Sequence, residues 1–182
     1  MKKNNDEVRN TRKEIVDWAQ TLIVSLVVVI VFYTFFFRVV TVDGQSMDPT
    51  LQQNDRMLMR VIGYTPQRGD IVVIDSYSQY GKPLIKRVIG LPGDVIDIDF
   101  ATGDVSVNGT VLDEPYIAAP TVQQHEVRFP VTVEEGHIFV MGDNRPISLD
   151  SRSSDVGQLD CMDVLGKVFF RIFPLQKIGT VR

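Results

Sequence analysis

The hydrophobic and polar positions divide the chain into two parts. Residues 18–37 are 20 consecutive uncharged residues, WAQTLIVSLVVVIVFYTFFF, whereas the residues before them mix charged and apolar positions. At about 1.5 Å per residue, a helix of this length spans the roughly 30 Å hydrocarbon core of a bilayer. Bulky residues follow at positions 35–40, where a cleavable signal peptide would carry small ones. The pattern therefore predicts an uncleaved transmembrane helix over residues 18–37, preceded by a tail over residues 1–17.

The remainder, residues 41–182, is a succession of short apolar runs. Clusters of Gly, Pro and Asp separate runs at residues 57–62, 71–74, 84–89, 131–133 and 137–141. Residues 95–99 alternate in polarity, and residues 104–112 place Asn108 and Gly109 between two strand-like runs, a strong hairpin signal. A final run at residues 164–173 ends before Pro174. These patterns predict a mainly β fold, a twisted, barrel-like antiparallel sheet domain preceded by one N-terminal transmembrane helix.

Charged residues on the two sides of the apolar segment indicate its orientation. The Lys and Arg residues before it are Lys2, Lys3, Arg9, Arg12 and Lys13. Only Arg38 lies within about 15 residues after it. Because positively charged flanks stay on the cytoplasmic side, the sequence predicts a single-pass protein of the cell membrane. Its tail over residues 1–17 is expected in the cytoplasm, and residues 41–182 outside it.

Composition argues against several kinds of site. The 182 residues carry 19 Lys and Arg against 23 Asp and Glu, a net charge of −4 that does not favour nucleic-acid binding. One cysteine, Cys161, forms no internal disulfide, and one Cys with two His does not build a zinc cluster. The acidic residues Asp94, Asp97, Asp99 and Asp104 lack the spacing of a calcium loop. We therefore expect no metal, no cofactor and no nucleic-acid partner.

Two residues remain as candidates for catalysis. The sequence has no Gly-x-Ser-x-Gly, His-Glu-x-x-His, phosphate-loop or dinucleotide-binding motif. His125 and His137 lie in or beside strand-like segments with no triad arrangement, which favours structural or solvent-facing roles. Ser46 lies in a turn nine residues beyond Phe37, and Lys86 lies among apolar residues of a predicted strand.

A lysine enclosed by hydrocarbon differs chemically from one in water. Burial disfavours the ammonium form, so the pKa falls from its ordinary value of about 10.4 toward about 7 or 8. A neutral amine accepts the proton of a serine hydroxyl as the oxygen attacks a carbonyl, and later gives it to the leaving amine. Ser46 and Lys86 are therefore a candidate catalytic pair, if the strand that carries Lys86 is buried.

Four segments resemble, in order, the successive sequence boxes of bacterial type I signal peptidases. They are residues 46–51 (SMDPTL), 69–73 (GDIVV), 86–94 (KRVIGLPGD) and 142–152 (GDNRPISLDSR). Their order and spacing behind an N-terminal apolar segment also fit that family. Gly44, two residues before Ser46, is similar to the Gram-positive branch, whereas other members carry a serine there.

The resemblance implies a Ser–Lys serine protease that removes signal peptides from exported preproteins. The implied cleavage takes place at the membrane–water boundary on the outer side of the cell membrane. Ser46 matches the nucleophile and Lys86 the general base. Ser148 matches the serine whose hydroxyl bonds the lysine amine and orients it. Four more residues match scaffold ion pairs beside the site, Arg87 with Asp143 and Arg152 with Asp150. Ordinary surface salt bridges are the other interpretation of these pairs.

Substrate binding can be predicted in outline. Because Gly44 brings no hydroxyl, the oxyanion is expected to rely mainly on the backbone N–H of Ser46. An extended signal peptide is expected to add as a strand beside residues 42–47 or Ile85, with shallow apolar pockets for small side chains. Met47 is a candidate pocket wall, although core packing explains it equally well. The expected partners are preprotein signal peptides delivered by the secretion machinery, and membrane lipid.

Two other functions remain open at this point. One is an inactive, membrane-anchored binding or assembly module of the same fold, which would be expected to lack Ser46 or Lys86. The other is a self-cleaving repressor-type Ser–Lys protease, which would be expected to carry a DNA-binding helical domain in place of the apolar segment. This chain retains both residues and has the apolar segment.

Overall fold

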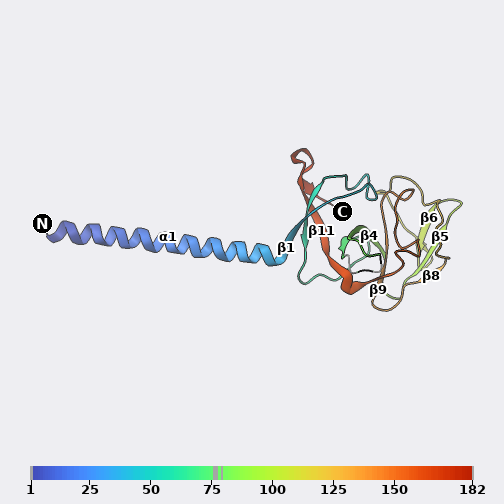
Figure 1. Ribbon diagram of the computed structural model, residues 1–182, viewed down its shortest axis with the longest axis horizontal. Coiled ribbons are helices and arrows are strands. Elements are labelled where there is room, and N and C mark those ends of the chain that lie inside the picture. Colours follow the sequence, from blue (N-terminus) through green and yellow to red (C-terminus); the bar gives the residue numbers. More distant parts are fainter. Residues whose placement is uncertain (1, 76–77, 79, 182) are drawn as a thin grey trace. The chain divides into compact units, whose positions relative to one another are not determined.

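The computed structural model describes residues 2–75, 78 and 80–181, with side chains from residue 13 onward (Figure 1). The chain forms two compact units, Met1–Phe37 and Arg38–Arg182. The first residue of the predicted tail and the last residue of the predicted β domain lie outside the described residues.

The first unit is the helix α1 (Lys2–Phe36). Its segment Lys13–Phe36 is long and apolar enough to cross a membrane, and none of it is buried against other protein. The helix includes the predicted tail as well as the predicted span. It ends at Phe36 rather than Phe37, because the chain enters strand β1 (Phe37–Thr41) at that point.

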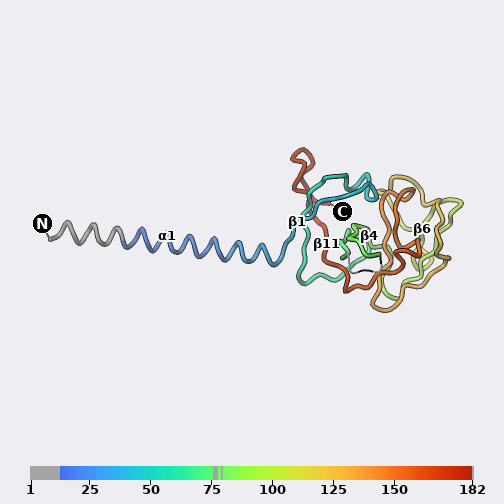
Figure 2. Tube along the Cα trace, in the orientation of Figure 1, coloured from blue at the N-terminus to red at the C-terminus, as the bar shows by residue number. Residues whose placement is uncertain are grey.

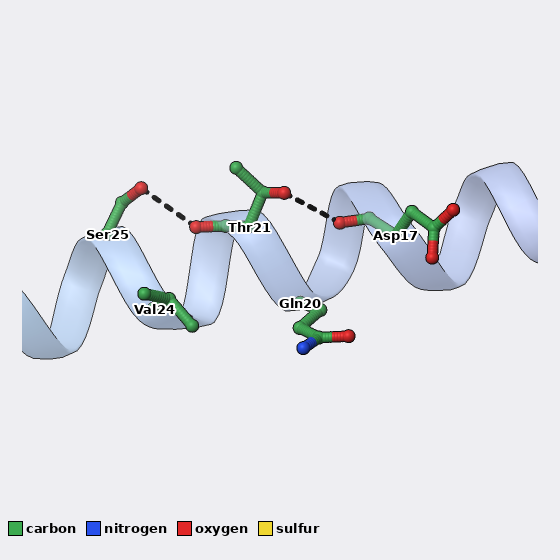
Figure 3. A pocket seen from close by; sticks show the side chains of 5 residues that line it. All are labelled: Asp17, Gln20, Thr21, Val24 and Ser25. Atoms are coloured by element: carbon green, nitrogen blue, oxygen red, sulfur yellow. Dashed lines mark hydrogen bonds between the residues drawn. The ribbon is translucent and has the colours of Figure 1, made fainter.

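Hydroxyl side chains in this helix are hydrogen-bonded to the helix itself. Thr21 Oγ1 donates to the carbonyl of Asp17, and Ser25 Oγ donates to the carbonyl of Thr21, each at 2.8 Å (Figure 3). Thr34 donates to the carbonyl of Ile30 in the same way. Each of these hydroxyls donates its hydrogen bond to the backbone carbonyl four residues earlier, so none is left as an unpaired donor. These polar residues are therefore compatible with a hydrocarbon environment.

The second unit is built on a large sheet with the strand order β1-β2-β11-β3-β4-β9-β10, and β12 pairs with β11 outside this path. After β1 its strands are β2 (Arg56–Arg60), β3 (Ile71–Ile74), β4 (Leu84–Gly90), β9 (His137–Met141), β10 (Leu159–Asp160), β11 (Val164–Phe173) and β12 (Gly179–Thr180). Two short 3-10 helices, η1 (Cys161–Asp163) and η2 (Leu175–Lys177), flank β11.

The last long strand, β11, joins two hairpin-like halves of this sheet. It pairs antiparallel with β2 through Lys167–Phe173 and with β3 through Val164–Val168, with register shifts along its length. In Figure 2 the orange-red β11 segment therefore runs beside segments coloured as the first half of the chain. Strands β2 and β3, which are close in sequence, are not neighbours, since β11 lies between them.

A smaller sheet has the order β7-β6-β5-β8. Its strands are β5 (Val95–Asp99), β6 (Asp104–Val107), β7 (Thr110–Val111) and β8 (Val131–Thr132). Asn108 and Gly109 join β6 to β7 with φ of 51° and 77°, a pair of positive values that suits the predicted tight hairpin turn. In Figure 1, β5, β6 and β8 lie at the end of this unit away from β1 and β11.

Three apolar clusters form the interior of this unit. One packs residues of β2, β3 and β11 under the segment after β1, and it includes Met47 and Leu51. A second joins the small sheet to β4 and β9, and a third lies between β3, β4, β9 and β10. The paired strands with a defined register run antiparallel. The predicted fold class, a mainly β curled antiparallel sheet after one N-terminal apolar helix, is confirmed.

Candidate active site

Ser46 lies in the turn between β1 and β2. The N–H of Val42 donates to the carbonyl of Asp55 at 2.9 Å and closes this segment. Met47 and Leu51, 1% and 0% exposed, anchor the turn in the apolar cluster beneath it. Ser46 itself is half-buried. The apolar neighbours thus fix the turn while the serine stays partly open to solvent.

Strand β4 brings Lys86 to this turn from the interior of the sheet. Lys86 pairs in register with Val72 of β3, and its side chain is buried, 3% exposed. The Nζ atom of Lys86 lies 2.7 Å from Oγ of Ser46, within hydrogen-bond distance. Two residues that are 40 positions apart in the sequence are therefore in direct contact.

Burial lowers the pKa of Lys86 to about 8. Desolvation is the largest cause; the charge of Asp150 opposes it, Arg152 adds to it, and Asp143 opposes it. Among the residues that the structure describes, no salt bridge joins a carboxylate to this amine. The amine is thus accessible in its neutral form near neutral pH, which a base for a hydroxyl requires.

The Arg87–Asp143 ion pair connects the turn that carries Ser46 with the strand that carries Lys86. The contact between Ser46 and Lys86 is called the dyad below. Arg87 Nε and Nη2 donate to the two carboxylate oxygens of Asp143 at 2.8 and 2.6 Å. The hydroxyl of Thr50, in the turn that carries Ser46, donates to the same carboxylate at 2.5 Å. Because Arg87 follows Lys86 on β4, the carboxylate of Asp143 links the turn that carries Ser46 to the strand that carries Lys86.

A second buried pair joins Asp150 to Arg152. Arg152 Nε and Nη2 donate to the carboxylate of Asp150 at 2.8 and 3.0 Å, and both side chains are fully buried. The N–H of Gly142 also donates to this carboxylate. Burial raises the pKa of Asp150, but hydrogen bonds and the charge of Arg152 outweigh it and hold that pKa below its usual range. The carboxylate whose charge acts most strongly on Lys86 is therefore already paired with an arginine.

Ser148 is buried next to the dyad, but it does not make the expected hydrogen bond. Lys86 Nζ is instead bonded to Ser46, and the Ser148 hydroxyl lies beside the carboxylate of Asp150, whose pKa it helps to lower. A Cβ built on Gly142 would overlap both Ser148 Oγ and the carbonyl oxygen of Ser46. Only glycine therefore lets this segment approach the nucleophile so closely. The orienting role of Ser148 stays a prediction.

The backbone around Ser46 bears on the expected oxyanion site. Gly44 has a φ of 98°, a left-handed value that favours glycine, and its N–H donates to Gln53 Oε1. The carbonyl of Ser46 accepts from the N–H of Asn144 at 3.0 Å. Within the described part of the chain, the N–H of Ser46 donates to no protein group. That donor is therefore available to a bound ligand.

Residues of β1, β3, β4 and β11 line an apolar groove. It has a volume of about 440 Å³ and is lined by Val40, Thr41, Asp43, Val73, Pro83, Ile85 and Leu165. Ile85 precedes Lys86 on β4, so the groove borders the strand that carries the amine. Met47 is not part of this lining: it is 1% exposed and packs in the core against Val73 and Ile85. Met47 therefore belongs to the core, and a role as a pocket wall stays a prediction.

Sequence reasoning gave no role to a third buried ion pair near the site. Arg145 Nη1 and Nη2 donate to the two carboxylate oxygens of Glu114 at 2.9 and 2.5 Å. The guanidinium carbon of Arg87 also lies 3.8 Å from the centroid of the Tyr116 ring. Glu114 and Tyr116 lie outside the four motif segments, and no local spacing indicates these contacts.

The remaining candidate residues lie away from the dyad. His137 begins β9, and its Nδ1 is 3.0 Å from the carbonyl of Glu135. Cys161 is a half-buried free thiol. Among the described residues, no group of three or more His, Cys, Asp and Glu side chains is placed to hold a metal ion.

The chain is similar to characterised peptidases over most of its length. Residues 15–173 match the family "Signal peptidase, peptidase S26". The chain is 35% identical to signal peptidase I of Bacillus licheniformis, over 93% of this chain and 94% of the relative. It is 36% identical to a probable signal peptidase I-2 of Synechocystis, over 99% and 82%. A solved structure of signal peptidase I from Enterococcus faecalis is 34% identical, with a TM-score of 0.49, and covers 57% of this chain and 97% of that chain.

The family match covers the apolar part of α1, the turn with Ser46, the strand with Lys86 and the loop with Asp143 and Asp150. The alignments cover 93% and 99% of this chain, and 94% and 82% of the two relatives. The chain therefore belongs to the signal peptidase family, peptidase S26, and is a serine peptidase.

Proposed function

We propose that this protein is a membrane-anchored endopeptidase that cleaves signal peptides from exported preproteins with a Ser46–Lys86 dyad. The observation that carries this proposal is the 2.7 Å contact between Ser46 Oγ and a Lys86 amine that is 3% exposed. The names of the relatives, signal peptidase I, support the substrate class.

In the first half of the proposed reaction, the neutral amine of Lys86 takes the proton of the Ser46 hydroxyl. The serine oxygen attacks the scissile carbonyl carbon, and the carbonyl oxygen becomes an oxyanion. The free N–H of Ser46 donates to that oxyanion, one donor of a kind that contributes about 3 to 4 kcal/mol to transition-state stabilisation. The C–N bond then breaks, and the Lys86 ammonium gives its proton to the leaving amine.

In the second half, water replaces the leaving peptide. Lys86, neutral again, takes a proton from water as its oxygen attacks the acyl carbon bound to Ser46. The second tetrahedral intermediate collapses, Oγ leaves and recovers its proton from the ammonium. An amine whose pKa is about 8 suits both directions of proton transfer near neutral pH.

The groove beside Ile85 is the proposed binding site for the residues before the scissile bond. An extended peptide there forms backbone hydrogen bonds with the flanking strand segments, as in strand addition. The lining is mostly aliphatic and shallow, which suits small side chains in the peptide. Strand addition also holds the scissile carbonyl in the extended conformation that attack by Ser46 requires.

The proposed anchor is α1, whose apolar segment is Lys13–Phe36. Basic residues before this segment favour a cytoplasmic N-terminus and an extracytoplasmic β unit. Within the β unit, exposed apolar side chains gather where β11 turns into β12: Phe173, Leu175 and Ile178 are 47%, 71% and 51% exposed. This apolar turn is a proposed contact with lipid headgroups, since exposed aliphatic and aromatic residues favour that interface.

The test is cleavage of a purified preprotein by the detergent-solubilised chain, with the new N-terminus sequenced. Ser46→Ala and Lys86→Ala should each abolish cleavage and keep the circular dichroism spectrum. Ser154→Ala and Lys82→Ala are matched controls, because both residues are exposed and lie outside the site. Full turnover by either dyad variant would refute the dyad. An intact preprotein after incubation with the wild-type chain would instead favour the inactive binding module.

A further inference from the structure

A loop of residues 113–121, which follows β7 of the small sheet, is hydrogen-bonded to the segment that carries Asp143. The carboxylate of Glu114 accepts two hydrogen bonds from Arg145, whose side chain is fully buried. Thr121 Oγ1 accepts a third at 2.7 Å. The N–H of Ala118 donates to the carbonyl of Asp143 at 3.0 Å. The loop is thus fixed to both residues that flank Asn144.

Tyr116 in this loop covers the Arg87–Asp143 ion pair. The guanidinium carbon of Arg87 lies 3.8 Å from the centroid of the Tyr116 ring. The N–H groups of Arg87 point in the plane of the guanidinium, to Asp143 and to the carbonyl of Gly69. Its flat face offers no hydrogen bond, and an aromatic ring there attracts the cation and excludes water. The Tyr116 hydroxyl donates to Glu114 at 3.0 Å, which holds the ring in place.

The covered ion pair is linked to the two segments that carry Ser46 and Lys86. Asp143 accepts the hydroxyl of Thr50, four residues after Ser46. Arg87 is the neighbour of Lys86 on β4. A loop that is 30 residues from Lys86 in sequence therefore reaches the dyad through one guanidinium and one carboxylate.

We propose that Tyr116 is a positioning residue for the Ser46–Lys86 dyad, acting by stacking on Arg87 and keeping the Arg87–Asp143 pair dry and closed. This inference rests on the proposed function of the dyad. The Glu114–Arg145 pair holds the loop that presents the ring, so the small sheet supports the site through this loop.

The stacking of Tyr116 on Arg87 has an electrostatic consequence for the amine of Lys86. The charged groups that act on Lys86 are Asp150, Arg152 and Asp143, and the groups around the stacked pair are Arg87, Glu114 and Arg145. Asp150 keeps its own arginine whatever happens at Tyr116. Loss of the ring wets and loosens only the Arg87–Asp143 pair. The charge of Asp143 is then less compensated, and the ammonium form of Lys86 becomes more favourable.

The experiment is the pH dependence of preprotein cleavage by Tyr116 variants of the full chain in detergent. Tyr116→Leu should lower kcat about tenfold at pH 7, leave KM within about twofold, and move the acid limb upward by about half to one pH unit. Tyr116→Phe keeps the stacking face and should keep the wild-type limb. Tyr64→Leu is the matched control, since Tyr64 is also half-buried and also donates to a carboxylate, Asp70.

A second variant covers the case in which Tyr116→Leu does not fold. Pentafluorophenylalanine at position 116 keeps the shape of the ring but removes its attraction for a cation, so it too should raise the acid limb. An unchanged limb in this folded variant, or a change in KM alone, would overturn the inference. The pKa of Lys86, followed by its reactivity with an amine-labelling reagent, gives the same answer without turnover. If the wild-type chain cleaves nothing, the proposed function fails while this measurement still decides the role of Tyr116.

Discussion

The buried cations around the site fall into two groups, three arginines and one lysine. Arg87, Arg145 and Arg152 are each paired with a carboxylate at 2.5 to 2.8 Å, and their side chains are 0 to 2% exposed. Lys86 is about as deeply buried, at 3%, but its bond is to the hydroxyl of Ser46. The arginines keep their charge in the interior because a carboxylate compensates for lost hydration.

The lysine lacks that compensation, and its pKa falls to about 8 as a result. The two nearby carboxylates supply it only in part, since Asp143 is bonded to Arg87 and Asp150 to Arg152. Pairing the arginines thus has two effects: it stabilises the scaffold, and it keeps the carboxylates from holding a proton on the amine. The arginines therefore stay charged, whereas the lysine is the group that can take up and release a proton in the proposed reaction.

The largest expected effect comes from turning the lysine into a fourth arginine. Lys86→Arg should lower the single-turnover cleavage rate on the order of 10⁴-fold, because a guanidinium does not deprotonate and no base remains. Rapid-quench measurement of preprotein cleavage checks this, with Lys82→Arg as the exposed control. A rate within tenfold of wild type would show that the amine is not the base.

Breaking one arginine pair should cost stability. Arg152→Met leaves the fully buried carboxylate of Asp150 without its cation, and we expect a loss of about 3 to 5 kcal/mol in the free energy of unfolding. Chemical denaturation followed by near-ultraviolet circular dichroism measures it. The double variant Asp150→Asn, Arg152→Met should recover part of the loss. A loss below about 1 kcal/mol in the single variant would contradict the scaffold role.

Removing the amine should have the opposite effect on stability. Lys86→Met should abolish cleavage but stabilise the fold by about 1 to 3 kcal/mol at pH 7, because the folded pKa of about 8 lies below the ordinary value of 10.5. Between these values the unfolded wild-type chain binds more protons, so wild-type stability rises with pH in that window. The advantage of Lys86→Met should therefore be full below pH 8 and vanish above about pH 10.5. Melting curves at pH 7 and pH 10.5 test this, and an advantage independent of pH would contradict it.

An exposed ion pair should contribute least to the free energy of unfolding. Arg68 donates to Asp94 at 2.7 Å, but its side chain is 39% exposed and remains hydrated. Arg68→Ala should change the free energy of unfolding by less than about 1 kcal/mol. Denaturation under the conditions used for Arg152→Met gives a direct ratio of the two effects. Equal losses from the two variants would mean that burial does not decide what an ion pair contributes.

Secondary structure could be predicted best where turn residues bound an apolar run. The predicted runs at residues 71–74, 95–99, 137–141 and 164–173 coincide with β3, β5, β9 and β11. Strand β1 was missed, since its sequence FRVVT continues the apolar helix with no intervening Gly or Pro. The two-residue strands β10 and β12 were missed as well, because they are defined by their partners rather than by a pattern of their own.

The site could be predicted only in part, for a similar reason. Motif spacing singled out Ser46 and Lys86, and the structure brings their side chains into contact. The Glu114–Arg145 pair joins positions 31 apart that no periodicity connects. Whether Ser148 bonds the amine depends on small differences in position, which residue type does not determine. Met47 was compatible with core or pocket; it packs in the cluster with Leu51 and Met57, and a contact with substrate stays a prediction.

The position of β11 between β2 and β3 also affects how a newly made chain acquires activity. The segment with the serine and the one with the lysine are joined through a strand at residues 164–173, which follows both of them in the chain. Until that strand has emerged and inserted, the hydroxyl and the amine belong to separate half-sheets. The contact between Ser46 and Lys86 is thus expected to require a strand that follows both residues in the chain.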